Sequence, residues 1–265
     1  MFPADNPWRR DISHAPLSPH SAAWVRSVGR SVHLHPDFGS NPSYGIPLTV
    51  VPADQRKLPI RFTAYGSESD PGPYPVPHSA RIEAGSDRHV LVASHNCHLY
   101  ELYAAHRTQR GWAAASGAVF NLRSDRLRPA GWTSADAAGL PISAGLVRPA
   151  EIRAGHIDHA LRFTVSETQH GYIHPATHEA GSTRGAPPMG ARFRLKSSFS
   201  LAHFHGAARI VLACLKKYGM FVSDNGSNWF ISGATWRGWN DADLDQLKRV
   251  PGSAFQVVQT GPIHH

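Results

Sequence analysis

The chain has 265 residues, of which 41% are hydrophobic and only 17% are charged. This hydrophobic content excludes a globally disordered chain, and the length is sufficient to bury a core without disulfide or metal staples. The formal net charge is +8, but the basic residues are dispersed and form no stripe interleaved with aromatic residues, so no nucleic-acid partner is expected. No apolar run reaches transmembrane length, so no membrane partner is expected either.

The first half of the chain predicts one short helix followed by a series of strands. The helix should begin at Ser18-Pro19, since Ser is a good N-cap and Pro suits the first helical position, and it should end at Gly29. Strand-like segments separated by turn residues then follow. They are residues 46–51, 58–65, 89–94, 98–103 and 114–122.

The second half contains the clearest helix, residues 205–218, in which apolar residues recur at helical spacing and Gly219 follows. Residues 220–223 and 229–232 should form a hairpin across Asp224-Asn225-Gly226, because Asn-Gly is the strongest short hairpin signal. The other elements are short helices at 149–154 and 241–249 and strands at 160–165, 171–175, 191–196 and 254–258.

These strands do not alternate with full-length helices, which argues against a parallel α/β sheet. The sequence therefore predicts a mainly β protein, a single-domain β-sandwich or barrel-like antiparallel fold decorated with three or four short helices. This domain should span residues 1–263 and be a monomer. The last two residues, His264 and His265, resemble the remnant of a purification tag.

Two cysteines, Cys97 and Cys214, cannot form a disulfide framework, although a single bridge between them stays open. Cys214 falls on the apolar side of the helix at 205–218, which favours a buried free thiol. The initiator Met precedes Phe-Pro-Ala-Asp-Asn-Pro-Trp directly. This opening resembles a Met joined to a mature exported chain, so we expect a secreted or periplasmic protein.

Three acidic residues are candidates for glycosidic bond cleavage, which needs one carboxyl group as acid and another as base or nucleophile. Glu101 lies among apolar and aromatic neighbours, where burial would raise its pKa and suit a general acid. Asp136 lies in the polar, Gly- and Pro-bounded loop 131–141, and Asp224 lies at the predicted hairpin turn. Structural roles are the alternative: Glu101 facing solvent or pairing with an Arg, Asp136 capping loop amides, and Asp224 shaping the turn.

Four residues are candidates for substrate contacts. Trp132 and Trp229 lie in polar, Gly-rich surroundings, where an indole can stack on a sugar ring or instead anchor a loop in the core. His159 and Arg162 cluster with Asp158 at a strand start. A polysaccharide lyase would use such groups to neutralise a uronate and abstract its proton.

The 18 histidines raise the question of a metal site. The best candidate set is His33, His35 and Asp37, because alternate residues of a strand share one side. Residues 170, 174 and 178 are also histidines, but Gly171 and Pro175 exclude the helix that would align them. With so many histidines chance groupings are expected, so the sequence predicts no metal and no cofactor.

Four segments of the chain are similar to segments of other proteins. They are residues 131–141, the run His-Ala-Leu-Arg-Phe-Thr-Val at 159–165, Pro-Met-Gly-Ala-Arg-Phe-Arg-Leu at 188–195, and Lys-Lys-Tyr-Gly-Met at 216–220. In these segments the chain is similar to a group of exported bacterial proteins of unassigned function. The resemblance implies an exported bacterial origin and transfers no activity, cofactor or site residue.

Together these patterns indicate a secreted, metal-independent enzyme that hydrolyses glycosidic bonds in a polysaccharide or oligosaccharide. Glu101, Asp136 and Asp224 would supply the acid and base, with substrate contacts from the two tryptophans and the His159–Arg162 cluster. Three alternatives stay open: a lyase acting on an acidic glycan, a non-catalytic carbohydrate-binding module, and a His-ligated metalloenzyme.

Overall fold

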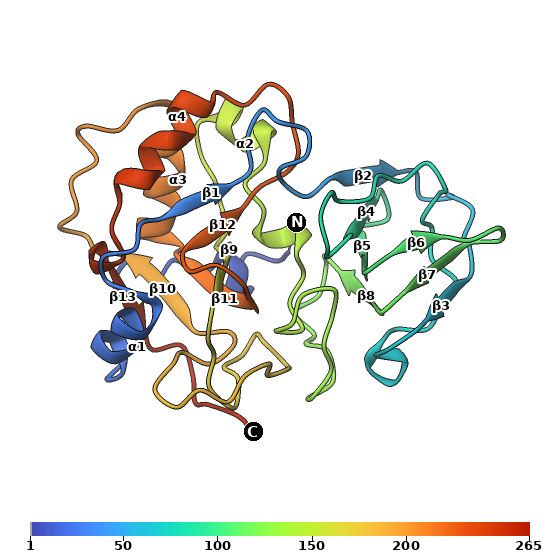
Figure 1. Ribbon diagram of the computed structural model, residues 1–265, viewed down its shortest axis with the longest axis horizontal. Coiled ribbons are helices and arrows are strands. Elements are labelled where there is room, and N and C mark those ends of the chain that lie inside the picture. Colours follow the sequence, from blue (N-terminus) through green and yellow to red (C-terminus); the bar gives the residue numbers. More distant parts are fainter. Residues whose placement is uncertain (1) are drawn as a thin grey trace.

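The structure, a computed structural model, describes residues 2–265 and has two lobes (Figure 1). The large lobe contains one six-stranded sheet and the helices, and the small lobe contains a four-stranded and a three-stranded sheet. The prediction of a mainly β protein with few short helices is confirmed. The α-helices are α1 (Ser21–Val28), α2 (Pro149–Ala154), α3 (Gly206–Lys217) and α4 (Asp241–Asp245).

The six-stranded sheet has the order β1-β12-β9-β11-β10-β13. Its central strand pair, β9 with β11, is parallel, as is the edge pair of β1 with β12, and the remaining pairs are antiparallel. The strands are β1 (His35–Asp37), β9 (Leu161–Val165), β10 (Arg192–Leu195), β11 (Met220–Asn225), β12 (Phe230–Ser232) and β13 (Phe255–Val258).

The small lobe is built from the earlier part of the chain. Its four-stranded sheet has the order β2-β4-β5-β8 and its three-stranded sheet the order β3-β7-β6, with β2–β4 and β3–β7 parallel. The strands are β2 (Leu48–Val51), β3 (Ile60–Phe62), β4 (Val90–Ser94), β5 (His98–Tyr103), β6 (His106–Arg107), β7 (Trp112–Ala114) and β8 (Ser116–Asn121).

The finer topology predicted from the sequence is not confirmed. The sheets are mixed rather than antiparallel, and those formed by residues 2–265 are open rather than closed into a barrel. The predicted hairpin across Asp224-Asn225-Gly226 does not form, because β9 lies between β11 and β12 and pairs with both. The apolar residues of β9 explain its central place, since Leu161 and Phe163 are completely buried there.

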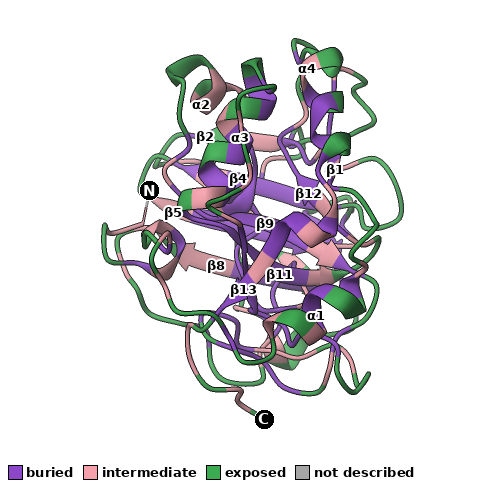
Figure 2. Cartoon of the chain, turned by 90° about the vertical axis from the view of Figure 1, so that its left-hand side faces the viewer, coloured by how far each residue is buried: buried purple, intermediate pink, exposed green. Residues whose placement is uncertain are grey.

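The main hydrophobic core lies between the six-stranded sheet and the helices (Figure 2). Helix α3 turns Val211, Leu212 and Leu215 into this core, which is the amphipathic pattern read from the sequence. The thiol of Cys214 is also buried and donates to the carbonyl of His159 at 3.0 Å. Both cysteines are free, so the chain has no disulfide between them.

Trp229 lies at the centre of this core. Its indole stacks on Phe163 and Phe255, with ring centroids 5.8 and 5.0 Å away, and its Nε1 donates to the carbonyl of Gly29 at 2.9 Å. Trp229→Ala should therefore destabilise the protein by about 3–5 kcal/mol, through the cavity and the lost hydrogen bond. Urea unfolding checks this expectation, and a loss below about 1 kcal/mol would contradict the central packing role.

A small, separate core cluster joins the two lobes. Leu91 of β4 packs with Ile46, Ala135, Ile142 and Leu146, which come from the segments that run between the lobes. Among residues 2–265, none of the helices combines the length and hydropathy needed to cross a bilayer.

Candidate active site at the junction of the two lobes

One face of the six-stranded sheet carries a row of polar side chains. Asp37 of β1 pairs with Ser232 of β12, and Asp224 of β11 pairs with Thr164 of β9. Paired residues of neighbouring strands point to the same face of a sheet, and so do residues two apart on one strand. Arg162, two residues before Thr164, therefore belongs to the same row. The alternate residues of β9 face the hydrophobic core on the other side.

Arg162 holds the row together through a buried ion pair. Its Nε and Nη2 donate to both carboxylate oxygens of Asp136 at 2.9 and 2.6 Å, and its Nη1 donates to Ser232 Oγ at 2.5 Å. The side chains of Arg162 and Asp136 are only 5% and 0% exposed. This bidentate geometry is the strongest form of a charge-assisted hydrogen bond. It fixes the loop 131–141 of the junction against β9.

Asp224 lies next to this pair and is more accessible. Its Oδ2 is 3.9 Å from Arg162 Nη2, and its side chain is 25% exposed. The pKa of Asp224 is raised from 3.8 to about 7. Burial is the largest cause and repulsion from the Asp136 carboxylate the second, and the attraction of Arg162 opposes both. A carboxyl group that is half protonated at neutral pH is suited to give or take a proton.

The small lobe contributes a second ion pair to the junction. His89 Nδ1 lies 2.5 Å from Glu83 Oε2, and His89 Nε2 lies 3.0 Å from the carbonyl oxygen of Ala135. Burial disfavours the charged imidazole, but the hydrogen bond and the charge of Glu83 outweigh it and raise the pKa of His89. His89 makes one contact with each ring nitrogen, so it connects the small lobe to the loop that carries Asp136.

Further acidic and aromatic groups complete the open side of the junction. Burial raises the pKa of Asp37, and the charges of Glu83 and Asp87 add to this effect. Burial also raises the pKa of Tyr103 at the end of β5, with further contributions from Asp87 and Asp224. Asp87 thus affects both Asp37 of the large lobe and Tyr103 of the small lobe, and Asp224 affects Tyr103.

Glu101 also faces the junction but is completely buried. Its two oxygens accept hydrogen bonds from the backbone N–H groups of Ile142 and Ser143, both at 2.8 Å. Burial raises the pKa of Glu101, an effect that these hydrogen bonds oppose. Both carboxylate oxygens are occupied, so the geometry gives Glu101 an anchoring role for the segment that connects the lobes.

Glu101→Gln should therefore destabilise the fold by about 1–3 kcal/mol, because one of the two backbone N–H groups would face an amide donor instead of an acceptor. Urea unfolding of the variant at pH 7 gives this number. A variant as stable as the parent would show that the Glu101 contacts do not support the junction.

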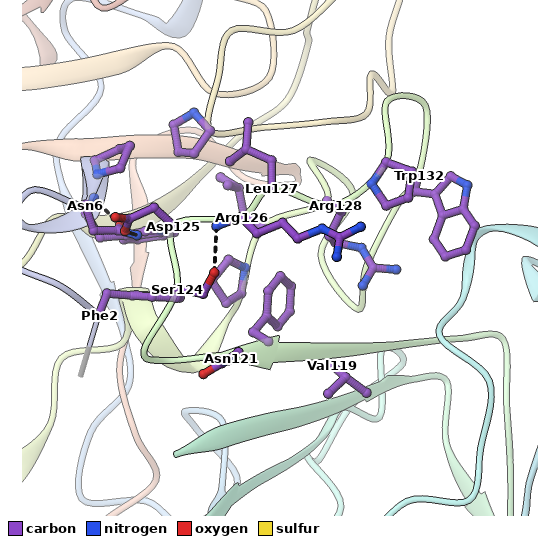
Figure 3. A pocket seen from close by; sticks show the side chains of 18 of the residues that line it. Phe2, Asn6, Val119, Asn121, Ser124, Asp125, Arg126, Leu127, Arg128 and Trp132 are labelled. Carbon is purple, nitrogen blue, oxygen red and sulfur yellow. Dashed lines mark hydrogen bonds between the residues drawn. The ribbon is translucent and has the colours of Figure 1, made fainter. Parts of the chain in front are cut away.

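The two predicted sugar-stacking tryptophans have different environments. Trp229 is buried in the core, and no face of its indole is open to a ligand. Trp132 lines the wall of a cavity of about 510 Å³ at the junction (Figure 3). The Arg128 guanidinium lies 5.6 Å from the centroid of the Trp132 ring and also 5.6 Å from that of Phe120, so these groups form a continuous cation–aromatic wall.

The same cavity has a polar side formed by Asn6, Asn121, Ser124, Asp125 and Arg126 (Figure 3). Asn6 Nδ2 donates to Asp125 Oδ1 at 2.6 Å, which joins the N-terminal segment to the small lobe. A cavity with an aromatic wall and a few polar groups is the usual form of a small-molecule or sugar site.

His159 belongs to a different cluster from Arg162. Its Nε2 lies 2.8 Å from Glu151 Oε1 of α2, and its Nδ1 lies 2.7 Å from the carbonyl oxygen of Ala160. Arg148 joins this cluster, and hydrogen bonds from His159 and Arg148 lower the pKa of Glu151 to about 2 despite its burial. The cluster lines a second, largely apolar cavity of about 440 Å³.

The candidate metal set His33, His35 and Asp37 is not brought together as a ligand group. The His35 ring instead stacks on Phe230 with the centroids 4.1 Å apart. Within residues 2–265, one group of three histidine, cysteine or acidic side chains has its ligand atoms within 4.8 Å of one another, and it consists of His170, Glu179 and His265.

Sequence reasoning missed several groups at the junction. Glu83, Asp87 and His89 lie in and after a turn-rich segment, and no local pattern marks them. Asp37 was considered only as a metal ligand. Their proximity to Asp224 depends on how the two lobes meet, which no spacing in the sequence encodes.

Comparison of the chain with family models, with curated protein sequences and with solved structures finds no significant match. The description of the protein thus comes from its structure: it is a two-lobed, mainly β protein whose lobes meet at a charged, partly exposed group of side chains.

Proposed function

We propose that this protein is a carbohydrate-active hydrolase that cleaves glycosidic bonds in a polysaccharide, with Asp224 as the proton donor and Asp37 as the second carboxylate. The observation that carries this proposal is the position of Asp224. It lies on the same face of the sheet as Asp37, it is partly open to solvent, and its pKa is about 7.

The environments of the two aspartates support different roles. Glycosidases need one carboxyl group that is protonated when the substrate binds and one that is ionised. Asp224 lies beside the Asp136 carboxylate, which favours its protonated form. Asp37 lies at the exposed end of β1, and the charge of Arg162 opposes the burial that raises its pKa, so we assign it as the ionised partner.

The other two predicted acids have supporting roles in this proposal. Asp136 is saturated by Arg162, and Glu101 is saturated by two backbone N–H groups. Neither has an oxygen free to meet a substrate. Asp136 instead acts through Asp224, because its negative charge keeps the neighbouring carboxyl group protonated at neutral pH.

The Trp132 cavity is the proposed binding site for neighbouring sugar units. Trp132 and Asp136 are four residues apart on the loop 131–141, so their Cα atoms are separated by at most about 14 Å. In this proposal a chain of several sugars lies along the junction, with one unit on the Trp132 ring and the scissile bond beside Asp224, which is not among the residues that line the Trp132 cavity. Such a substrate is an oligomer or polymer rather than a monosaccharide.

The sequence resemblance supports an exported bacterial protein, as an extracellular polysaccharide substrate would require. Fractionation of a producing bacterium into cytoplasm, periplasm and medium tests this part of the proposal. Recovery from the cytoplasm alone would contradict it.

A panel of neutral and acidic polysaccharides tests the activity. New reducing ends without near-ultraviolet absorbance would establish hydrolysis. New ends with that absorbance, which an unsaturated product ring gives, would identify a lyase and overturn the proposal. Saturable binding without product would identify a carbohydrate-binding module and would also overturn it.

A further inference from the structure

A group of histidines from two distant parts of the chain meets outside the junction. The backbones of Tyr172 and His264 exchange two hydrogen bonds, of 2.9 Å (Tyr172 N to His264 O) and 2.8 Å (His264 N to Tyr172 O). This pairing packs His264 and His265, which the sequence alone suggested to be a tag remnant, against the loop that contains His170 and His174. The rings of His170 and His265 stack with centroids 5.1 Å apart, and those of His174 and His264 lie 4.2 Å apart.

Glu179 completes the group. His170 Nδ1 lies 2.8 Å from Glu179 Oε1, and the other oxygen of Glu179 accepts a hydrogen bond from the backbone N–H of Gly171. One ligand atom from each of His170, Glu179 and His265 lies within 4.8 Å of the other two. The orientation of Glu179 is thus fixed by the backbone before any ion binds, which is the usual arrangement around metal-ligating carboxylates.

We propose that His170, Glu179 and His265 form a binding site for a divalent transition metal of the zinc class. Two imidazole nitrogens and one carboxylate oxygen are a ligand set that Zn²⁺ takes, with water as the fourth ligand. Zinc binds such atoms at about 2.0–2.2 Å in a tetrahedron, which needs ligand atoms about 3.3–3.5 Å apart.

The exposure of the group fits an accessible site. The side chains of His170 and Glu179 are 64% and 33% exposed, so an ion can reach them without opening the fold. The bound ion would link the C-terminal residues to the loop around His170, in addition to the backbone pairing at Tyr172. It would therefore act as a clip, and its role is independent of the proposed hydrolase chemistry.

Titration calorimetry with ZnCl₂ tests this site on the full chain after chelator treatment. We expect one zinc per chain at micromolar affinity, weakened about tenfold or more by His170→Ala and by Glu179→Gln. Affinity should also fall below pH 6, where histidines are protonated. Zinc should raise the unfolding temperature of the parent protein but not that of His170→Ala, because only a folded-state ligand stabilises.

Two matched controls make the result specific. His174→Ala removes a neighbouring ring outside the three-ligand group, and His106→Ala removes an exposed histidine of β6 in the small lobe. Both should bind zinc within about threefold of the parent. Absence of saturable binding would overturn the site, and so would parental affinity in both His170→Ala and Glu179→Gln.

Discussion

Asp224→Asn should lower the rate of glycosidic bond cleavage by about 10²–10⁴-fold, the usual contribution of a positioned general acid. The amide has nearly the same shape but cannot give up a proton, so substrate affinity should change much less than the rate. Activity of the parent should fall as the pH rises above about 7, because the Asp224 carboxyl group then loses its proton. Initial rates on the cleaved polysaccharide between pH 5 and 9 give both results.

Asp158→Asn is the matched control, since this carboxylate has a 42% exposed side chain and pairs with the exposed His156. It should keep the parental rate. Asp37→Asn should also lose activity by a similar factor, because it removes the second carboxylate. Parental rates in Asp224→Asn would remove Asp224 from the mechanism.

Asp224→Asn should also change how the free energy of unfolding depends on pH. The pKa of Asp224 rises from 3.8 in the unfolded chain to about 7 in the fold, so the folded protein binds more protons between these values. Parent stability should thus decrease as the pH rises from 4 to 7. Asp224→Asn removes this loss and should be more stable than the parent at pH 8, by up to about 4 kcal/mol.

Asp136→Ala should destabilise the protein by about 3–5 kcal/mol, the second large effect expected. It leaves the guanidinium of Arg162, which is 5% exposed, without its bidentate partner. Urea unfolding at pH 7 measures this loss. A loss below about 1 kcal/mol would mean that water or Asp224 replaces Asp136 easily, and that the ion pair does not fix the junction.

The double variant Arg162→Met, Asp136→Leu provides the control for that measurement. Replacing both partners of a buried pair with apolar groups avoids an unpaired charge, so it should cost less than the sum of the two single changes. If the losses simply add, the two residues do not interact as the structure shows.

Much of the secondary structure could be predicted because its signals are local. Helix α3 follows from apolar spacing, terminal lysines and Gly219, and α2 from Pro149 at its first position. The hairpin at Asn225-Gly226 was wrong because strand pairing is a competition among distant segments. Here the apolar strand β9 lies between β11 and β12 and pairs with both.

The sequence could indicate which residues belong to the candidate site, but not how they contact one another. Asp136, Arg162 and Asp224 were selected from the sequence, and the structure brings all three within one network. The sequence could not indicate that Arg162 saturates Asp136 and leaves Asp224 accessible. Trp229 shows the same limit, because a tryptophan in a polar segment can equally face solvent or fill the core, and here it fills the core.

The most direct test of the proposed site is the titration of the Asp224 carboxyl carbon, followed by NMR in protein labelled with ¹³C at its aspartates and assigned through Asp224→Asn. We expect a midpoint near pH 7 in the parent. We also expect a clear decrease in Asp136→Asn, where the repelling carboxylate is gone and Arg162 is free to pair with Asp224. A parental midpoint near pH 4 would contradict the proton-donor role, and the proposed chemistry would fail with it.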